Sequence, residues 1–332
     1  MNPYFGKNFL EFLGLFFERS LQFLTGRLPL SSLASDEVQI FSLICIGILT
    51  SLLGSFLVVR KMTMLANSLS HTILLGIVLS YLLLFHGRMS GFQIDLKVML
   101  ISAILAALLT SALTELLSKG LRLQEDASIG LVFTTLFALG VVLVTVFSRN
   151  THIGAEVIMG NVDALHLQDL KLVFWICLGN LLFIAAFFKE FYLTTFDSGF
   201  AKSIGVSPVL FHYILMFLTA VAAIAAFRAV GVFLVLALLV GPPLSARLIT
   251  NRLLRLIGAS MGLSCISSIC SVAISRHILS VHKIPLSTAG IMITLVLILY
   301  CLVVAATFLF PFFYKLFAGR AYLKEPQSRN LD

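Results

Sequence analysis

Long apolar stretches alternate with short polar connections along almost the whole chain. A helix needs about 20 mainly apolar residues to cross the hydrocarbon core of a bilayer. Nine stretches reach or nearly reach that length, at about 38–59, 62–85, 98–118, 128–148, 170–188, 208–227, 229–246, 253–275 and 285–313. The pattern therefore predicts an all-α, polytopic membrane protein with eight or nine transmembrane helices. Eight applies if the sixth and seventh stretches form one long element, broken only around Arg228.

The amino-terminal region has a different pattern. Residues 9–24 (FLEFLGLFFERSLQFL) are rich in aromatic side chains, but Glu11, Glu18 and Arg19 interrupt them and make the segment too polar for a good span. The pattern is typical of an amphipathic helix that lies in the membrane interface. A cleaved signal peptide is not expected, because the segment has neither a basic start nor a small-residue cleavage site.

No connection between the apolar stretches is long enough for a soluble domain. The longest polar connections, 148–169 and 189–207, have about 20 residues each. Ser31 to Glu37 is predicted to be a linker. We therefore expect two units: an N-terminal interfacial helix with its linker at 1–37, and a single transmembrane domain at 38–332.

The distribution of Lys and Arg predicts the orientation, because cytoplasmic loops carry an excess of these residues. With nine spans and a cytoplasmic carboxy-terminal tail, 13 of the 23 Lys and Arg residues fall in inside segments. The bias is modest. It places the connections around 60–61, 119–122 and 189–207 on the cytoplasmic side.

Composition supports a bilayer protein and excludes several other classes. Hydrophobic residues make up 59% of the chain and charged residues only 11%, less than half the share usual in soluble domains. Disorder is excluded by the same numbers. Five cysteines in apolar runs, without a CxxC pair, do not form a disulfide scaffold. The net charge of +8 is spread over short loops, so no nucleic-acid face is predicted.

The absent motifs are also informative. The chain has no G-x-x-x-x-G-K-[ST] loop for a nucleotide phosphate, no H-E-x-x-H and no G-x-S-x-G. Proton-driven transporters usually place charged residues deep in their spans, whereas these spans are almost free of acids and Glu115 lies near a helix end. The energy must therefore be supplied by another protein. This favours a permease subunit driven by a separate energy-supplying subunit, and it does not favour an enzyme.

Asn67 and His71 are the first candidates for chemistry. They are four residues apart at the start of the second apolar stretch, so they share one helical face, with Ser70 beside them. A histidine at membrane depth is costly without a partner or a water-filled path, and neutral imidazole is a common ligand for transition metals. The alternative is a hydrogen bond between packed helices.

The most patterned polar segment is the loop 195–208. Asp197 or Ser198 can cap a short helix, Gly205 can end it, and Pro208 can start the next span. A short exposed helix between two spans suits a docking surface for a cytoplasmic partner. An ordinary connecting turn is the alternative.

Two further features leave alternatives open. Gly241-Pro242-Pro243 follows an apolar run and marks either a kink that lines a pore or the cytoplasmic end of a helix. Glu125 and Asp126 come just before the fourth apolar stretch, where they favour a structural cap of that helix. The other loop acids and histidines are either solvated or attract divalent cations; these are His152, Glu156, Asp163, His166 and Asp169.

Taken together, these segments resemble the membrane subunits of the ABC-3 family, the metal-uptake ABC permeases for zinc, manganese or iron. The matching pieces, in order, are GSFLVVRKM (54–62), SLSH (68–71), EDASIG (125–130), MGN (159–161), FD…FA…GV (196–206), AVGV (229–232) through LLV (238–240), and ARL (246–248). The resemblance covers about residues 38–310.

The resemblance implies an ABC-3 type permease fold at 38–332 and a multi-pass location in the cell inner membrane. It also implies two cytoplasmic ABC ATPase subunits, a second permease subunit and an extracytoplasmic solute-binding protein. The divalent metal ion is the transported substrate, and no permanently bound cofactor is expected. The implied coupling contact with the ATPase lies on Phe196, Asp197, Phe200, Ala201, Ile204 and Gly205.

The chain departs from the family pattern at the implied metal residues. The family normally has Asp four residues before the intramembrane His, whereas this chain has Asn67 before His71. An amide oxygen is a weaker, neutral ligand, so a heterodimer whose other permease supplies the carboxylate is favoured over a homodimer. Arg228, and the extension before residue 38, are further departures.

The function expected is thus the membrane-spanning permease subunit of an ATP-driven importer for manganese, zinc or iron. The alternative is a secondary active metal or drug transporter that does not use ATP.

Overall fold

The computed structural model describes residues 3–4, 6–26, 29, 32–64, 68, 72, 75–76, 78–80, 96–147 and 162–322. Every regular element within these residues is a helix, so the all-α prediction is confirmed. The elements are α1 (Phe9–Leu24), α2 (Ser35–Val59), α4 (Leu96–Glu115), the π-helical turn η2 (Leu116–Gly120), α5 (Glu125–Phe147), the 3-10 turn η3 (Val162–Ala164), α7 (Leu167–Ala186), α8 (Phe188–Phe196), α9 (Ser198–Ser203), α10 (Pro208–Val230), α11 (Val232–Ile249), α12 (Leu253–His282) and α13 (Thr288–Tyr322).

Six of the described helices contain segments long and apolar enough to cross a membrane. These segments are Ser35–Val59, Leu167–Ala186, Pro208–Phe227, Val232–Ile249, Leu253–His282 and Thr288–Thr307. Shorter apolar segments lie at Ile104–Ser118 and Ala127–Leu143, within two further predicted spans. The predicted stretch 62–85 lies partly outside the described residues. The multi-pass architecture is therefore confirmed, while the count of eight or nine stays a prediction.

Residues 208–249 form two helices and not one broken element. α10 ends at Val230 and α11 begins at Val232, and Gly231 between them has a φ of 84°, a conformation that favours glycine. The first turn of α10 and the last turn of α11 both lie near the carboxy-terminal end of α2. Phe211 of α10 contacts Phe191 of α8, which contacts Phe56 of α2, and Arg247 of α11 donates a hydrogen bond to Val58. The chain therefore reverses direction at Gly231.

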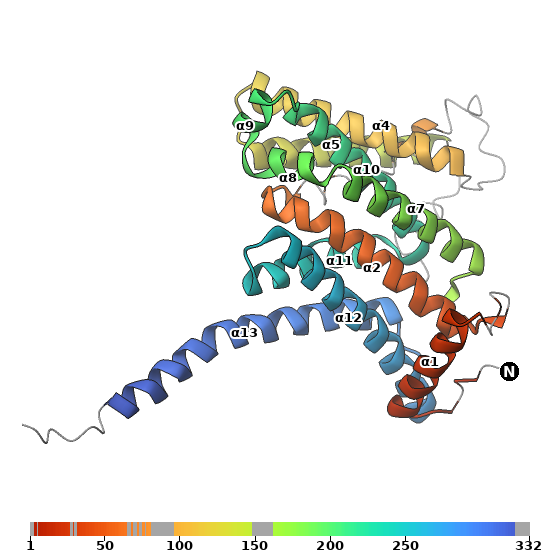
Figure 1. Cartoon of the computed structure of the whole chain (residues 1–332). Helices are drawn as coiled ribbons and strands as arrows, with labels where there is room; N and C mark the ends of the chain where they lie inside the picture. Colours follow the sequence, from red (N-terminus) through yellow and green to blue (C-terminus); the bar gives the residue numbers. More distant parts are fainter. Residues whose placement is uncertain are drawn as a thin grey trace, which may run out of the picture.

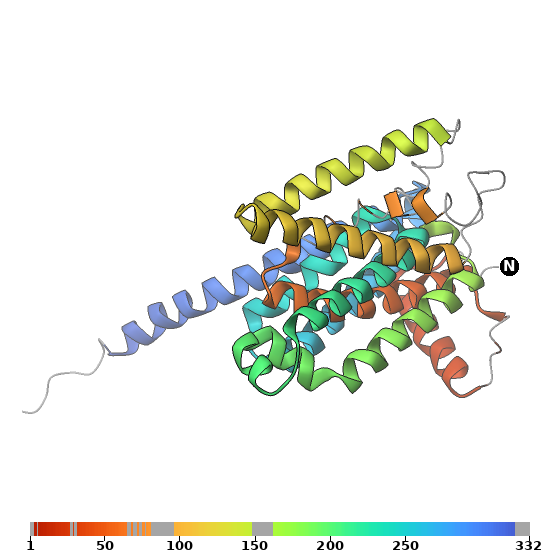
Figure 2. The same cartoon turned by 90° about the horizontal axis from the view of Figure 1, so that it is seen from above.

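Helix α2 occupies the centre of the bundle. It packs against α7 and α10 on one side and against α11 and α12 on the other (Figure 1). α1 lies near the start of α2 and contacts α12, whereas α9 lies at the opposite end of the bundle (Figure 1). We call these ends the α1 end and the α9 end. The carboxy-terminal half of α13 projects away from the other helices in both views (Figures 1 and 2).

Small residues and hydroxyl groups line the contact between α2 and α12. Residues spaced by four face one another: Gly47, Ser51 and Ser55 on α2, and Ser260, Ser264 and Ser268 on α12. The Oγ atoms of Ser51 and Ser264 lie 2.8 Å apart, and Ser264 also donates to the carbonyl oxygen of Gly47 at 3.2 Å. In lipid, where apolar surface gives no net drive for helix association, such close packing and hydrogen bonding hold helices together. We call this contact the serine seam.

On the same side, nearer its carboxy-terminal end, α2 meets the proline-containing turn of α11. The helix continues through Pro242 and Pro243 and ends only at Ile249, so the interpretation that the prolines mark its end is wrong. Pro243 has no N–H, so the carbonyl oxygen of Leu239 loses its normal helical donor. Gly54 of α2 approaches that same oxygen: a methyl carbon added there would lie only 1.9 Å from it. Because Pro243 has no N–H and Gly54 has no side chain, the backbones of α2 and α11 come into close contact here.

Replacing Gly54 by alanine should disrupt the bundle, because the clashing atoms belong to a backbone that cannot rotate away. We expect a loss of about 3 kcal/mol or more, at the upper end of overpacking costs. The matched control is Gly47→Ala, whose added carbon would lie 3.0 Å from Ser264 Oγ, the movable end of a side chain. That variant should change stability by less than about 1 kcal/mol, since alanine also favours helix. Thermal unfolding of the detergent-purified proteins measures both, and equal midpoints would contradict the close-approach argument.

Candidate functional site

The connection between α8 and α10 forms a short capped helix, α9. Asp197 ends α8 and begins α9, and its Oδ1 accepts a hydrogen bond from the backbone N–H of Phe200 at 2.8 Å. Gly205 has a φ of 85° and donates to Lys202, while Val206 donates to Ala201 at 2.9 Å, which closes the helix. The predicted short helix is confirmed in its local structure, with Asp197 and not Ser198 as the cap. Pro208 starts α10 as predicted.

Helix α9 presents apolar side chains to the surroundings at the α9 end. Phe196, Phe200 and Ile204 are spaced by four, and each is slightly more than half exposed. Ala201, on the opposite face, is completely buried against the bundle. We call the three exposed apolar side chains of Phe196, Phe200 and Ile204 the α9 face; exposed apolar side chains that gather in one place mark interaction sites. Of the six predicted coupling residues, Phe200 and Ala201 lie in α9, Phe196 and Asp197 directly precede it, and Ile204 and Gly205 directly follow it.

Two arginines fix α2 at the α9 end. Arg60, immediately after α2, donates from Nε to Thr195 Oγ1 at 3.0 Å and from Nη2 to Thr194 Oγ1 at 2.9 Å, both on α8. Arg247 of α11 donates to the carbonyl oxygen of Val58 at 2.8 Å. Burial lowers the pKa of Arg60 to about 10, which leaves it cationic at neutral pH. Sequence reasoning counted these arginines for orientation and missed their contacts.

The predicted metal residues Asn67 and His71 lie outside the described residues. Their sequence neighbours Ser68 and Thr72 are buried, and Thr72 accepts a hydrogen bond from Thr110 of α4 at 3.0 Å. Hydroxyl and small residues spaced by four again face one another: Ser68, Thr72, Gly76 and Ser80 against Ser102, Ala106, Thr110 and Thr114. A second polar seam is therefore formed by residues that are close in sequence to the predicted metal residues. Its four-residue spacing was visible in the sequence and was not used.

The loop acids in the described part of the chain have structural contacts. Asp163 Oδ1 accepts hydrogen bonds from Gln39 at 2.9 Å and from Thr288 at 2.5 Å, which joins α2 to α13. Asp169 accepts from the backbone N–H of His166 and caps α7. Among the described residues no group of three His, Cys, Asp or Glu side chains could hold a metal ion. His152 and Glu156 lie outside the described residues, and Glu125 and Asp126 form the first turn of α5.

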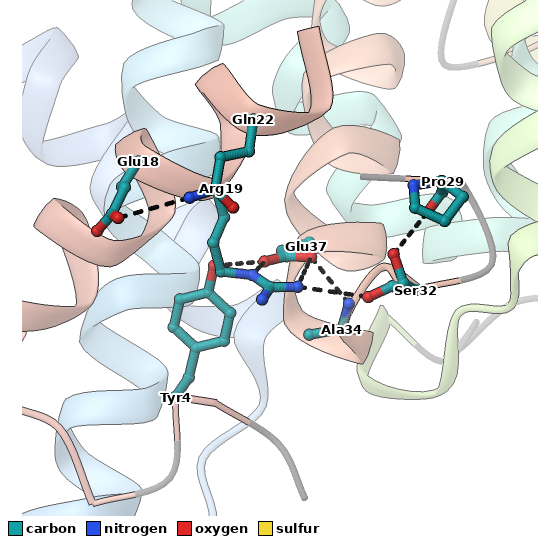
Figure 3. A network of polar contacts seen from close by, with 8 residues as sticks. All are labelled: Tyr4, Glu18, Arg19, Gln22, Pro29, Ser32, Ala34 and Glu37. Atoms are coloured by element: carbon teal, nitrogen blue, oxygen red, sulfur yellow. Dashed lines mark hydrogen bonds and ion pairs between the residues drawn. The ribbon is translucent and has the colours of Figure 1, made fainter. Parts of the chain in front are cut away.

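A polar network closes the α1 end (Figure 3). The guanidinium of Arg19 on α1 pairs with the buried carboxylate of Glu37, and the hydroxyl of Tyr4 donates to the same carboxylate at 2.7 Å. The neighbouring Asp36 is completely buried and pairs with Arg276 of α12. Burial and the hydrogen bond to Glu37 raise the pKa of Tyr4, so its hydroxyl stays protonated.

This network corrects the predicted linker at 31–37. α2 begins at Ser35, so the last three residues of that segment are helical, and two of them are buried acids. The predicted helix over 9–24 is present as α1, with Phe12 and Phe16 buried against the bundle. The sequence pattern indicated a linker at 31–37, because the partners of Asp36 and Glu37 lie far away in the sequence.

Comparisons with known proteins agree with these features. Residues 38–307 match the ABC 3 transport family. A probable metal transport system membrane protein of Chlamydia muridarum is 38% identical over 308 residues, 93% of this chain and 95% of the relative. The manganese transport system membrane protein MntD of Bacillus subtilis is 38% identical over 225 residues, 64% of this chain and 73% of the relative.

A solved structure supports the fold. PsaBC from Streptococcus pneumoniae, in complex with Fab, superposes with a TM-score of 0.67 over 85% of this chain and 94% of that chain, at 23% identity.

Breaking the ion pair at the α1 end should destabilise the bundle. Arg19→Met leaves Glu37 buried with only Tyr4 and a backbone donor, and we expect a loss of about 3 kcal/mol. Adding Glu37→Gln should recover part of that loss, because the unpaired charge is removed. Glu18→Gln, on the exposed side of the same helix, is the control and should cost less than about 0.5 kcal/mol. Thermal unfolding in detergent measures the cycle; a loss in Arg19→Met no larger than in the control would show that the pair is not structural.

Proposed function

The chain belongs to the ABC 3 transport family, and on that premise we propose that it is the membrane-spanning permease subunit of an ATP-driven importer. The substrate proposed is a divalent metal cation: manganese, zinc or iron. Two observations on relatives support a metal substrate, since one is named for metal transport and another for manganese transport. We further propose a location in the cell inner membrane.

The observation that carries the proposal is the α9 face. A permease without a nucleotide-binding loop needs a partner that supplies energy, and that partner needs a docking surface on the permease. Phe200 and Ile204 form a short apolar face that can enter a groove of a cytoplasmic ATPase. Basic residues at the α9 end, among them Lys61, Lys202 and Arg247, support its cytoplasmic location.

The remaining partners follow from the same proposal. A solute-binding protein delivers the ion at the α1 end, and a second permease subunit completes the translocation path. The ion passes His71 with Asn67 as a weak neutral partner, because transport requires binding that also releases. A heterodimer, in which the second subunit supplies the missing carboxylate, accommodates the amide of Asn67.

Uptake of radioactive manganese or zinc into right-side-out membrane vesicles or proteoliposomes that contain ATP tests the proposal. In vesicles that hold this chain with its ATPase and solute-binding protein, we expect metal uptake that requires ATP and stops when the ATPase is inactivated. Uptake by this chain alone on an ion gradient would instead support a secondary transporter. Specific photolabelling of the isolated chain by azido-ATP would contradict the assignment of ATP to a partner.

Variants at the proposed metal residues test the path. His71→Ala should reduce uptake at least about tenfold at an unchanged protein level, because the imidazole ligand is lost. Asn67→Asp should slow release if the second permease already supplies a carboxylate, and should raise uptake if it does not. Metal accumulation in cells distinguishes these results. Unchanged uptake in His71→Ala would make this histidine a packing residue.

A substitution at the end of α9 tests the coupling contact. Gly205→Val forces a branched side chain into a positive φ, so the end of α9 should rearrange while the spans remain inserted. We expect normal assembly in the membrane but loss of metal-stimulated ATP hydrolysis. Gly199→Ala, on the same helix without a positive φ, is the control. Normal stimulation in Gly205→Val would contradict the coupling role of α9.

A further inference from the structure

We infer that Arg60 is the positioning residue that transmits movement of α9 to the central helix α2. This inference rests on the proposed function and adds a specific residue to it. The contacts that carry it lie between the end of α2 and the last turn of α8, directly before α9.

The guanidinium of Arg60 holds two adjacent hydroxyl groups in fixed orientations. Thr194 Oγ1 donates its own hydrogen to Glu190 O at 2.8 Å, and Thr195 Oγ1 donates to Phe191 O at 2.6 Å. The oxygen lone pairs are thereby directed to Arg60, whose Nε and Nη2 reach one hydroxyl each. The forked, planar guanidinium suits this two-point contact, and a lysine ammonium does not.

The hydrogen-bond acceptors of Arg60 are neutral, which limits the strength of its contact with α8. Arg60 forms no ion pair with any residue that the structure describes, although burial makes its charge costly. A bond from a cation to a hydroxyl is weaker than a bidentate bond to a carboxylate. The contact at the α9 end can therefore change its geometry during a transport cycle without separating an ion pair. At the α1 end, by contrast, arginines hold α2 through the carboxylates of Asp36 and Glu37.

Helix α8 connects α9 to α2. Asp197 is the only residue between α8 and α9, so a displacement of α9 acts on the end of α8 through one residue. Phe191 of α8 is completely buried between Phe56 of α2, at 5.7 Å, and Phe211 of α10, at 5.1 Å. Within the described part of the chain, both hydrogen bonds between α2 and α8 come from Arg60.

In the sequence, Arg60 lies between α2 and the apolar stretch that holds the proposed metal residues. It follows the last residue of α2, and the apolar stretch with the proposed metal residues begins two residues later. A displacement of Arg60 therefore acts where the central helix α2 ends and the proposed ion path begins. The serine seam passes the same movement to α12.

The test measures metal transported per ATP hydrolysed by the assembled complex in vesicles. Arg60→Gln should lower this ratio about tenfold while basal ATP hydrolysis and subunit assembly stay near wild type. Arg60→Lys should give an intermediate ratio, because one ammonium cannot reproduce the fork. Arg255→Gln, an exposed arginine at the same end of the bundle, is the control and should leave the ratio unchanged.

Variants of the two acceptors separate transmission from packing. Thr194→Val with Thr195→Val removes both hydroxyls at nearly constant shape and should lower the ratio as Arg60→Gln does. Thr194→Ser with Thr195→Ser keeps the hydroxyls and should preserve the ratio. The triple variant, which combines Arg60→Gln with both valine substitutions, should have a ratio no lower than Arg60→Gln alone or the double valine variant alone, because all three residues act through one contact.

Two results would overturn the inference. One is a wild-type ratio in Arg60→Gln. The other is a loss of activity that merely follows loss of assembled protein, with additive effects in the triple variant, since that is the behaviour of a packing residue. Absence of ATP-dependent uptake by the wild-type complex is a different result, and it contradicts the proposed function itself.

Discussion

The close contact between α2 and α12 is the constraint on which the rest of the bundle depends. In a bilayer, apolar side chains gain little by leaving lipid, so helices associate where backbones come near and polar groups pair. Gly47 and the serines of the seam permit both. Helix α2 is also held where Gly54 meets a carbonyl of α11 that proline has left without a helical donor. The contact at Gly54 leaves no room for a side chain, and together the two contacts make α2 the centre around which the other helices pack.

The two ends of α2 are held by different chemistry. At the α1 end, the buried carboxylates of Asp36 and Glu37 pair with arginines from α12 and α1. Separating such pairs would leave charges buried without partners, so this end is held firmly. At the α9 end, Arg60 meets threonine hydroxyls and Arg247 meets a backbone carbonyl. These neutral acceptors hold the helix with less energy, and this is the end that carries the α9 face. The asymmetry suits a permease in which force enters from one side of the membrane.

The site that we propose is therefore distributed over several elements and is not a single pocket. The proposed path begins at the exposed α9 face, passes through α8 and Arg60 to the end of α2, and continues in the sequence to Asn67 and His71. The buried hydroxyls of Ser68 and Thr72 lie beside that segment and pack against α4. A transported ion needs only brief, weak contacts along such a path. Membership of the ABC 3 transport family explains this arrangement, because family members work with partner proteins that the chain alone does not contain.

Local chemistry in the sequence determined the helical architecture and the ends of α9. Apolar length predicts a membrane helix because a bilayer has a fixed thickness, and Asp197, Gly205 and Pro208 act on the backbone only a few residues away. Other features required the tertiary structure. Whether Asp36 and Glu37 break a helix or begin one depends on Arg276 and Arg19, which no local pattern connects to them. Whether the prolines of α11 end that helix depends on the packing of α2 and α13 around them. These outcomes are set by contacts between segments distant in the sequence, and only the folded bundle brings those segments together.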